Sequence, residues 1–341
     1  MRPPIAVSGD GRWVAFRNGY VSARGGAIHR TSGSLVWAPR TDSYAVVTGR
    51  GGLEVGNPAQ PPRRLLPAGW GATTAVFSPD GRSLAVSRTA ERGRVEEIWL
   101  LHLDTGLREE LFREPRREGA PLLLQGFSAG GRWLLFWKDP YASASMLADG
   151  VPLLALPVRG ERPLRVTGEL YHDDYASWCD GKLFYVIDHG GREVTDGDGL
   201  AEAGPPSWRS ATVLPDAGRT SWTSFACSRT GTLAVAAGPS SANMARFGHE
   251  RRSIWLVHGR SATRLSGSVP PRHESDEWPR WSSDGRWLLF VRTRWTGRRW
   301  QGKLEAYDLS RNQLLGIASV GATSNYYGYY GWSSQLSWHR P

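Results

Sequence analysis

The sequence predicts an all-β fold built from one short unit that recurs along the whole chain. Three observations support this prediction. A turn phrase with Asp-Gly or a close variant recurs, strand-like runs flank each copy, and the copies follow one another at intervals of 30 to 54 residues. They start near residues 8, 38, 78, 128, 178, 228 and 282, so successive starts lie 30, 40, 50, 50, 50 and 54 residues apart. A spacing of this size is typical of a four-stranded β-propeller blade with its loops.

The copy at 78–86 shows how each unit folds. The run 75–77 predicts a first strand, and Asp80-Gly81 then predicts a tight hairpin turn, because glycine accepts a positive φ without a Cβ penalty. The apolar run after the turn predicts the neighbouring strand. Clear copies stand at 8–16, 128–136 and 283–290, degenerate ones at 178–185 and 228–235, and one without the glycine at 37–46.

Two further strands complete the better copies. These are the pairs 98–103 and 108–112, 253–257 and 263–265, and 304–307 and 313–315. The fifth unit fits worst, because no convincing strand is predicted between Val186 and the run 211–214.

The turn phrase resembles the TolB-like β-propeller repeat, whose signature is a Ser-Pro-Asp-Gly-Arg turn between the two inner strands of a blade. Ser78 to Arg82 matches that signature at every position. The resemblance implies a single β-propeller domain over 1–341, with seven blades and with six or eight as the alternatives. The expected blades are 1–33, 34–69, 70–119, 120–170, 171–218, 219–270 and 271–341. We expect the C-terminal strand 335–338 to pair within the first blade and so close the ring.

Composition excludes several classes of protein. No apolar run approaches the roughly 20 residues of a membrane helix, so no transmembrane segment is expected. No leader follows Met1, so we expect an extracytoplasmic protein by family resemblance if a leader was trimmed, and a cytoplasmic one if Met1 is the native start. The sequence leaves open whether Cys179 and Cys227, which fall on neighbouring blades, form a disulfide.

The chain is strongly cationic, with 42 Lys and Arg against 32 Asp and Glu, a net charge of +10. Nearly all of the cations are arginines. Such a balance is compatible with nucleic acid, anionic lipid or an acidic protein as partner, and equally with an arginine-rich proteome.

Propeller topology predicts where binding residues gather. The Asp-Gly turns fall at one end of every blade, and the long loops fall at the other end. The expected long loops are 139–152, 188–207, 239–252 and 292–302, with inter-blade loops at 169–175, 268–278 and 321–332. Long loops on a rigid scaffold commonly carry binding, so we expect function at that end.

Two segments are candidates for contact with a partner. An aromatic-rich stretch provides Tyr326, Tyr327, Tyr329, Tyr330 and Trp332. A basic stretch with interleaved indoles provides Arg294, Trp295, Arg298 and Arg299. Tyrosine, tryptophan and arginine are enriched at protein interfaces. The same residues are compatible with packing at the ring closure and with a long, solvated β-hairpin.

Four histidines with acidic neighbours are candidates for a divalent metal site, namely His172, His189, His249 and His273. Neutral imidazoles with carboxylates bind transition metals, but no ligand spacing here is diagnostic. The sequence contains no Gly-x-Ser-x-Gly elbow, which a fused hydrolase domain would need. It also contains no phosphate-binding loop or dinucleotide fingerprint, and no other cofactor is expected.

These observations favour a non-catalytic protein-interaction scaffold, since the resemblance implies an interaction module, with another protein as the expected partner. One alternative is a metal-dependent lyase or hydrolase acting on an acidic carbohydrate, and a second is a nucleic-acid or polyanion binder. A glycan is also a possible ligand, and the oligomeric state is left open.

Overall fold

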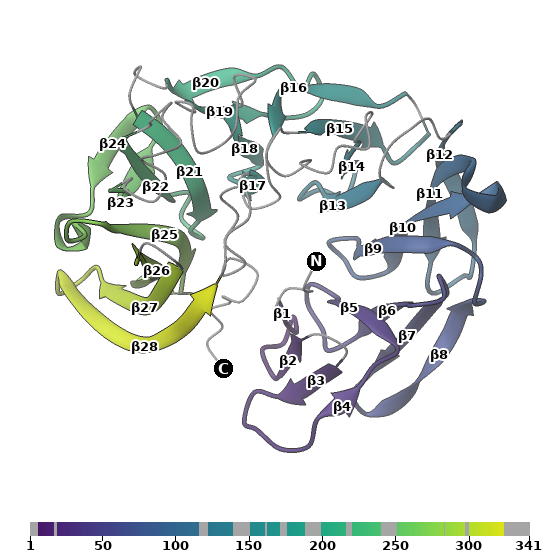
Figure 1. The fold of residues 1–341 in the computed structure, drawn as a ribbon. Coiled ribbons are helices and arrows are strands. Elements are labelled where there is room, and N and C mark those ends of the chain that lie inside the picture. The colour runs from purple at the N-terminus through teal and green to yellow at the C-terminus, as the bar shows by residue number, and fades with distance from the viewer. Residues whose placement is uncertain are drawn as a thin grey trace. The chain divides into compact units, whose positions relative to one another are not determined.

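A computed structural model describes residues 6–16, 19–115, 122–138, 151–160, 162–170, 176–187, 199–215, 220–239, 251–282, 284–296 and 300–323. These residues form seven four-stranded sheets (Figure 1). Within each sheet the strands lie side by side in the order of the sequence. The protein is a seven-bladed β-propeller. The prediction of an all-β fold is therefore confirmed.

The chain divides into two compact units, of which the first covers mainly 1–144 and 152–166. It holds the first four blades, whose strands follow here in order. Blade 1 has β1 (Ala6–Val7), β2 (Trp13–Phe16), β3 (Gly19–Ser22) and β4 (His29–Arg30). Blade 2 has β5 (Gly33–Trp37), β6 (Tyr44–Thr48), β7 (Leu53–Asn57) and β8 (Gln60–Leu66). Blade 3 has β9 (Ala72–Phe77), β10 (Ser83–Ala90), β11 (Val95–His102) and β12 (Arg108–Pro115). Blade 4 has β13 (Leu123–Phe127), β14 (Trp133–Trp137), β15 (Val151–Pro157) and β16 (Leu164–Leu170), the last of which crosses into the second unit at Thr167.

The second unit covers mainly 167–340 and holds the last three blades. Blade 5 has β17 (Ala176–Cys179), β18 (Lys182–Ile187), β19 (Gly199–Ala203) and β20 (Ala211–Leu214). Blade 6 has β21 (Thr220–Cys227), β22 (Leu233–Pro239), β23 (Ser253–His258) and β24 (Ser261–Arg264). Blade 7 has β25 (Glu274–Trp281), β26 (Trp287–Trp295), β27 (Trp300–Asp308) and β28 (Gln313–Thr323). Among the described residues, no helix is long or apolar enough to cross a membrane.

The repeated turn owes its sequence to a small hydrogen-bond network. In blade 3 the Ser78 hydroxyl donates to Asp80 Oδ1 at 2.6 Å, and the same oxygen accepts the Arg82 amide at 3.0 Å. Ser78 Oγ also accepts the Ser83 amide at 3.0 Å, which joins the two strands at their base. Gly81 has φ +75°, the left-handed region that glycine adopts without strain. The same serine–aspartate contact recurs in blades 1 and 7.

The core lies between consecutive blades, where the apolar faces of two sheets meet. In the first unit, Leu53 of blade 2 and Leu84 of blade 3 belong to one cluster. In the second, Ile254 of blade 6 and Phe290 of blade 7 belong to another. All four side chains are fully buried. Burial of this kind stabilises such a fold at roughly 25 cal/mol for each Å² of apolar surface removed from water.

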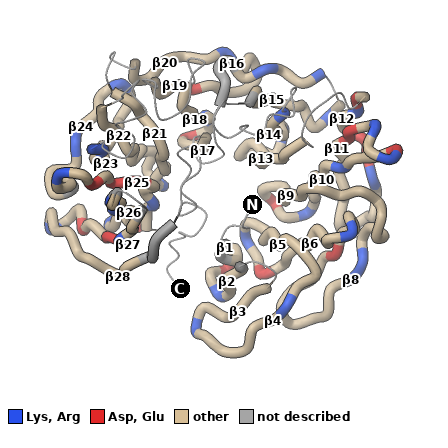
Figure 2. Tube along the Cα trace, viewed as in Figure 1, with Lys and Arg blue, Asp and Glu red and all other residues tan. Residues whose placement is uncertain are grey.

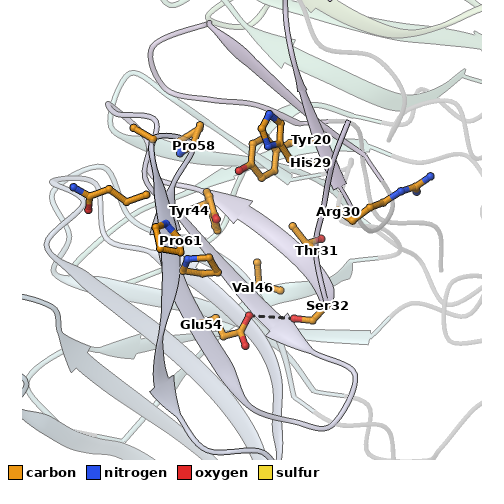
Figure 3. Close-up of a pocket in the computed structure, with 13 residues that line it drawn as sticks. Tyr20, His29, Arg30, Thr31, Ser32, Tyr44, Val46, Glu54, Pro58 and Pro61 are labelled. Atoms are coloured by element: carbon orange, nitrogen blue, oxygen red, sulfur yellow. Dashed lines mark hydrogen bonds between the residues drawn. The ribbon is translucent and has the colours of Figure 1, made fainter. Parts of the chain in front are cut away.

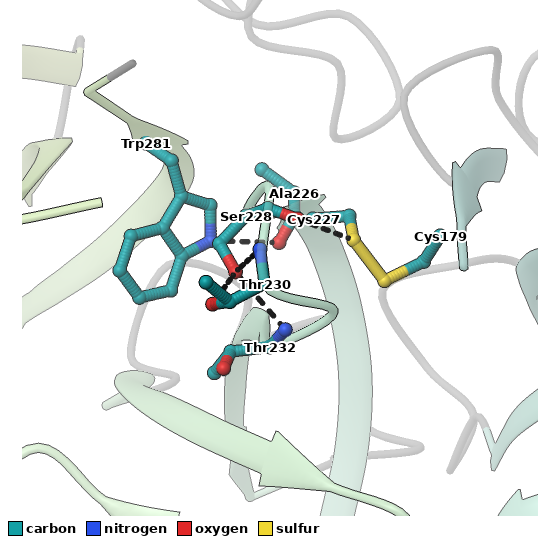
Figure 4. Close-up of a disulfide and its surroundings, with 7 residues drawn as sticks. All are labelled: Cys179, Ala226, Cys227, Ser228, Thr230, Thr232 and Trp281. Carbon is teal, nitrogen blue, oxygen red and sulfur yellow. Dashed lines mark hydrogen bonds between the residues drawn. A yellow bond between two sulfur atoms is a disulfide. The ribbon is translucent and has the colours of Figure 1, made fainter. Parts of the chain in front are cut away.

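A disulfide joins Cys179 at the end of β17 to Cys227 at the end of β21 (Figure 4). Their Cα atoms lie 5.4 Å apart, within the usual reach of a disulfide. The bond therefore ties the first strands of blades 5 and 6 at the turn end, and it answers the question that the sequence left open.

Three segments differ from the sequence-based expectations. The expected loop 188–207 contains β19, which is almost wholly buried although its sequence, Gly-Leu-Ala-Glu-Ala, lacks β-branched residues. The expected loop 292–302 is mostly strand, because β26 and β27 continue to Trp295 and from Trp300. The expected inter-blade loop 268–278 overlaps β25, which starts at Glu274. The proposed closing strand 335–338 lies outside the described residues, whereas β1 begins the first sheet.

Candidate functional site

The predicted partner-contact residues fall partly outside the described part of the chain. All five aromatic residues of 326–332, together with Arg298 and Arg299, lie outside it. Arg294 and Trp295 end β26, and Arg294 is exposed. In register, Trp295 faces Trp300, and Trp300 faces Thr323 at the end of β28. The end of the predicted basic stretch therefore lies at the same end of blade 7 as the end of β28, three residues before the aromatic stretch begins in the sequence.

The outer strand of blade 7 has an unusual edge. β28 is eleven residues long and contains neither a charged residue nor a proline. Two of its apolar side chains are exposed, Leu315 at 36% and Ile317 at 54%. By contrast, the outer strands β8 and β12 both carry arginine and proline, the usual protection of a sheet edge. No described strand pairs with the outer edge of β28.

Only one of the four predicted metal ligands, His273, lies among the described residues. His172, His189 and His249 lie outside the described residues. His273 directly precedes β25, is exposed and has φ +66°. Within the described ranges, no group of three or more His, Cys, Asp or Glu residues is placed to hold a metal ion. The four-histidine site stays a prediction.

Blade 7 contains a buried network of paired charges. Arg292 contacts both carboxylate oxygens of Asp276, at 2.7 and 2.9 Å. Beside it, Glu277 pairs with Arg252 at 2.9 Å, and Glu305 pairs with Lys303 at the same distance. Burial raises the pKa of Asp276 to about 7; Arg292 opposes this rise, and the neighbouring carboxylates add to it. Sequence analysis placed Asp276 and Glu277 in an exposed inter-blade loop, which is wrong because both side chains lie within β25 and are buried.

Blade 3 has a related arrangement at the equivalent repeat position. Arg88 stands ten residues after Ser78, as Arg292 does after Ser282. Its guanidinium forms an ion pair of 2.7 Å with the buried Glu97 and lies 4.4 Å from the centre of the Trp70 ring. The carboxylates of both networks are paired with arginine or lysine, so we assign these networks to strand positioning rather than to acid–base chemistry. Figure 2 shows that lysine and arginine are otherwise scattered along the strands of both units.

A pocket of about 510 Å³ opens between blades 1 and 2, where sequence analysis identified no site (Figure 3). Blade 1 contributes Tyr20 and His29, whose rings stack with centroids 4.8 Å apart. Blade 2 contributes Tyr44 from β6 and Glu54 from β7. The turn before β8 and its first residues add three prolines and Gln60 to the wall, and the link 30–32 and Val46 complete the lining.

Glu54 and Tyr44 are held in the pocket by neighbouring residues. Ser32 Oγ donates to Glu54 Oε2 at 3.2 Å. The Tyr44 ring packs against Gly56, where a Cβ would lie 3.1 Å from the Tyr44 hydroxyl oxygen, so glycine makes room for the tyrosine. Burial, a hydrogen bond with Tyr20 and the nearby Glu54 raise the pKa of Tyr44 well above its ordinary value. Tyr44 therefore remains a neutral phenol at the floor of the pocket.

The shortness of the first repeat unit is the one sequence feature that could have indicated this pocket. The starts of its copy and the next are 30 residues apart, which leaves no room for a full outer strand. β4 accordingly has only two residues, whereas β8 of blade 2 has seven. The pocket lies beside this short strand, on the part of blade 2 formed by β6, β7 and the start of β8.

Comparisons with known proteins agree with the fold. No protein-family model matches the chain, and no curated protein matches it. A solved prolyl endopeptidase structure is 11% identical with a TM-score of 0.60, covering 92% of this chain and 48% of its own. An oligogalacturonate lyase in complex with manganese is 13% identical with a TM-score of 0.53, covering 84% of each chain. A putative TolB from Agrobacterium tumefaciens is 15% identical with a TM-score of 0.42, covering 77% of this chain and 86% of its own.

These likenesses concern the propeller alone. The chain spans about half the length of the prolyl endopeptidase, and all three identities are low. The TolB-like character of the repeat therefore rests on the turn sequence, with Ser78 to Arg82 as its complete copy.

Proposed function

We propose that this protein is a non-catalytic interaction scaffold that docks another protein at the end of blade 7 formed by β28 and the β26–β27 hairpin. The observation that carries the proposal is the long, uncharged edge of β28 with its exposed Leu315 and Ile317. An unprotected edge offers backbone donors and acceptors to an extended segment of a partner, and exposed apolar side chains add contact area.

The edge of β28 is better suited to pairing with a short partner segment than with a long strand. The register between β27 and β28 shifts twice, between Gly302 and Lys303 and between Leu304 and Glu305. Such bulges bend a strand and interrupt continuous pairing, which disfavours open-ended edge-to-edge assembly. Arg311 is exposed two residues before β28, and Arg294 is exposed on β26, two strands inward from the other end of this edge. The partner segment that fits this arrangement is extended, apolar in its middle and acidic at its ends.

Site-specific photo-crosslinking in the source organism tests this proposal. A photoreactive residue at Leu315 is expected to capture one partner, and the same residue at Leu107, which is 55% exposed on blade 3, is expected not to. Ile317→Lys, or Tyr327→Ala with Tyr329→Ala, should abolish the capture and leave the melting temperature nearly unchanged. Equal capture from both crosslinking positions, or capture that persists in Ile317→Lys, would show that blade 7 is not the docking end.

The disulfide supports an extracytoplasmic location for the scaffold. Disulfides such as Cys179–Cys227 form and persist in oxidising compartments and are rare in the cytosol. Alkylation of thiols in intact source cells, before and after reduction, measures its state. Two free thiols before reduction would contradict this location.

The two alternatives have separate tests. A metal-dependent lyase or hydrolase predicts a stoichiometric metal ion in the purified protein, which His172→Ala or His273→Ala would remove. A nucleic-acid binder predicts affinity that falls steeply with salt and weakens in Arg298→Ala with Arg299→Ala. Among the described residues, lysine and arginine are scattered along the strands of each unit (Figure 2).

A further inference from the structure

The pocket between blades 1 and 2 is a second site, separate from the edge of blade 7, and its chemistry points to a ligand class. Its volume of about 510 Å³ is in the range of small-molecule sites. Tyr20, Tyr44 and Val46 are buried beneath it, so its floor is packed. Pro58, Pro61 and Pro62 form one wall, and because proline fixes φ, this wall is pre-formed.

The carboxylate of Glu54 is the feature that selects the ligand. In this cationic protein the buried carboxylates of Glu97, Asp276 and Asp308 each pair with arginine. Glu54 lines the pocket half-buried, and no described basic side chain lies within ion-pair distance of it. Its hydrogen-bond partner is Ser32, a neutral donor that leaves the negative charge in place.

The basic residues nearest in the fold leave the carboxylate open. Arg64 is paired opposite Glu54 across β7 and β8, so its Cβ lies on the same face of the sheet, yet it is exposed and forms no ion pair with Glu54 among the described residues. Arg30 lines the rim, and Figure 3 shows its guanidinium directed away from the other labelled side chains. A ligand cation would therefore meet the carboxylate without having to displace an existing ion pair.

Aromatic rings complete the environment for a cation. The rings of Tyr20, His29 and Tyr44 border the same pocket, and the Tyr44 phenol is electrostatically coupled to Glu54. Tyrosine rings attract cations through their negative faces, and a nearby carboxylate adds to this attraction. We propose that this pocket binds a small organic cation, an ammonium or guanidinium compound whose head group lies against Glu54 and whose apolar body lies along the proline wall.

Ligand titration of the purified full chain tests the proposal, with choline and agmatine as probes. The matched neutral probe is 3,3-dimethylbutan-1-ol, which has the shape of choline with carbon in place of the charged nitrogen. At least one cation is expected to bind with a Kd below 10 mM, and the neutral alcohol about tenfold more weakly or not at all. Saturation-transfer NMR and calorimetry measure both.

Variants separate the site from general charge effects. Glu54→Gln keeps an oxygen to accept the Ser32 hydrogen bond and should weaken cation binding about tenfold, removing the preference over the alcohol. Glu109→Gln, an exposed carboxylate on blade 3, should leave binding unchanged. Arg64→Gln removes a positive charge from the same face of the sheet as Glu54 and should strengthen binding. No binding by either cation, equal binding of the neutral alcohol, or unchanged binding in a folded Glu54→Gln variant would each overturn the proposal. None of these results bears on the blade 7 edge.

Discussion

Removing Arg292 should destabilise the protein strongly, because Asp276 would then be buried without its ion-pair partner. Asp276 is fully buried, and Arg292 is its bidentate partner. In Arg292→Met, Asp276 would lie beside Glu277 and Glu305 without a counter-charge, so the folded protein would have to bind a proton there. Breaking a buried pair in this way typically costs about 3–5 kcal/mol. We expect a cost of this size at pH 8 in urea unfolding followed by tryptophan fluorescence.

The cost of Arg292→Met should depend on pH. The pKa of Asp276 is about 7 in the folded protein and near 3.9 in an unfolded chain, so the folded state holds the proton more tightly. Its contribution to stability therefore falls as pH rises from about 4 to about 7. Without Arg292 the folded pKa rises further, so the cost of Arg292→Met should grow by up to about 1.4 kcal/mol per pH unit above pH 7. Adding Asp276→Asn should remove that growth.

Blade 3 provides the matched control at the equivalent repeat position. In Arg88→Met, the carboxylate of Glu97 keeps Arg113 and the Trp99 indole, whose Nε1 donates at 2.7 Å. The expected cost is the lost contact with Glu97 and the cation–π contact with Trp70, together about 1–2 kcal/mol, without growth above pH 7. A cost below 1 kcal/mol for Arg292→Met at pH 8, or equal costs for the two variants, would refute the reasoning.

Three further predictions concern other parts of the fold. Reducing the disulfide, or replacing Cys179 and Cys227 by serine, should lower the free energy of unfolding by up to about 4 kcal/mol, because the bond closes a loop with a sequence separation of 48. Equal urea midpoints with and without reductant would contradict this. Asp80→Ala should lower the free energy of unfolding by about 1 kcal/mol at pH 7, because the hydrogen bonds of Asp80 are exposed to water. The pKa of Asp80 is lowered in the folded protein, so the difference from wild type should shrink as pH falls below about 4. Gly71→Ala should lower the free energy of unfolding by more than 1 kcal/mol in the same assay, because φ is +92° and the added Cβ would lie 2.3 Å from the Thr89 carbonyl oxygen. An unchanged free energy of unfolding would contradict the left-handed conformation.

The sequence predicts the blades well because most of them contain a recognisable turn between their first two strands. The Ser78–Asp80 network and Gly81 act within six residues, so their chemistry can be read without knowledge of the rest of the fold. β19 shows the opposite case. Its small residues have little strand propensity, and it is a strand because its neighbours in blade 5 bury it.

The candidate sites depend on pairings that sequence spacing does not reveal. Asp276 and Glu277 lie in an acidic segment after His273, and acidic segments are usually exposed. Only the register of β25 against β26 shows that Asp276 faces Arg292, sixteen residues later, within the blade. The aromatic stretch 326–332 remains a prediction, since it lies outside the described residues.

Both candidate binding regions arise where the repeat departs from its own pattern. In blade 1 the outer strand is cut to His29–Arg30, and the pocket around Glu54 lies beside it. In blade 7 the outer strand has eleven residues and lacks the charges and prolines that protect β8 and β12. A regular blade hides its apolar face against the next blade and protects its outer edge, so it offers little to a ligand or a partner. Each irregularity exposes a different chemistry, a lone carboxylate among rings in one case and free backbone groups in the other. The two proposed binding regions therefore use different residues and different chemistry of one chain.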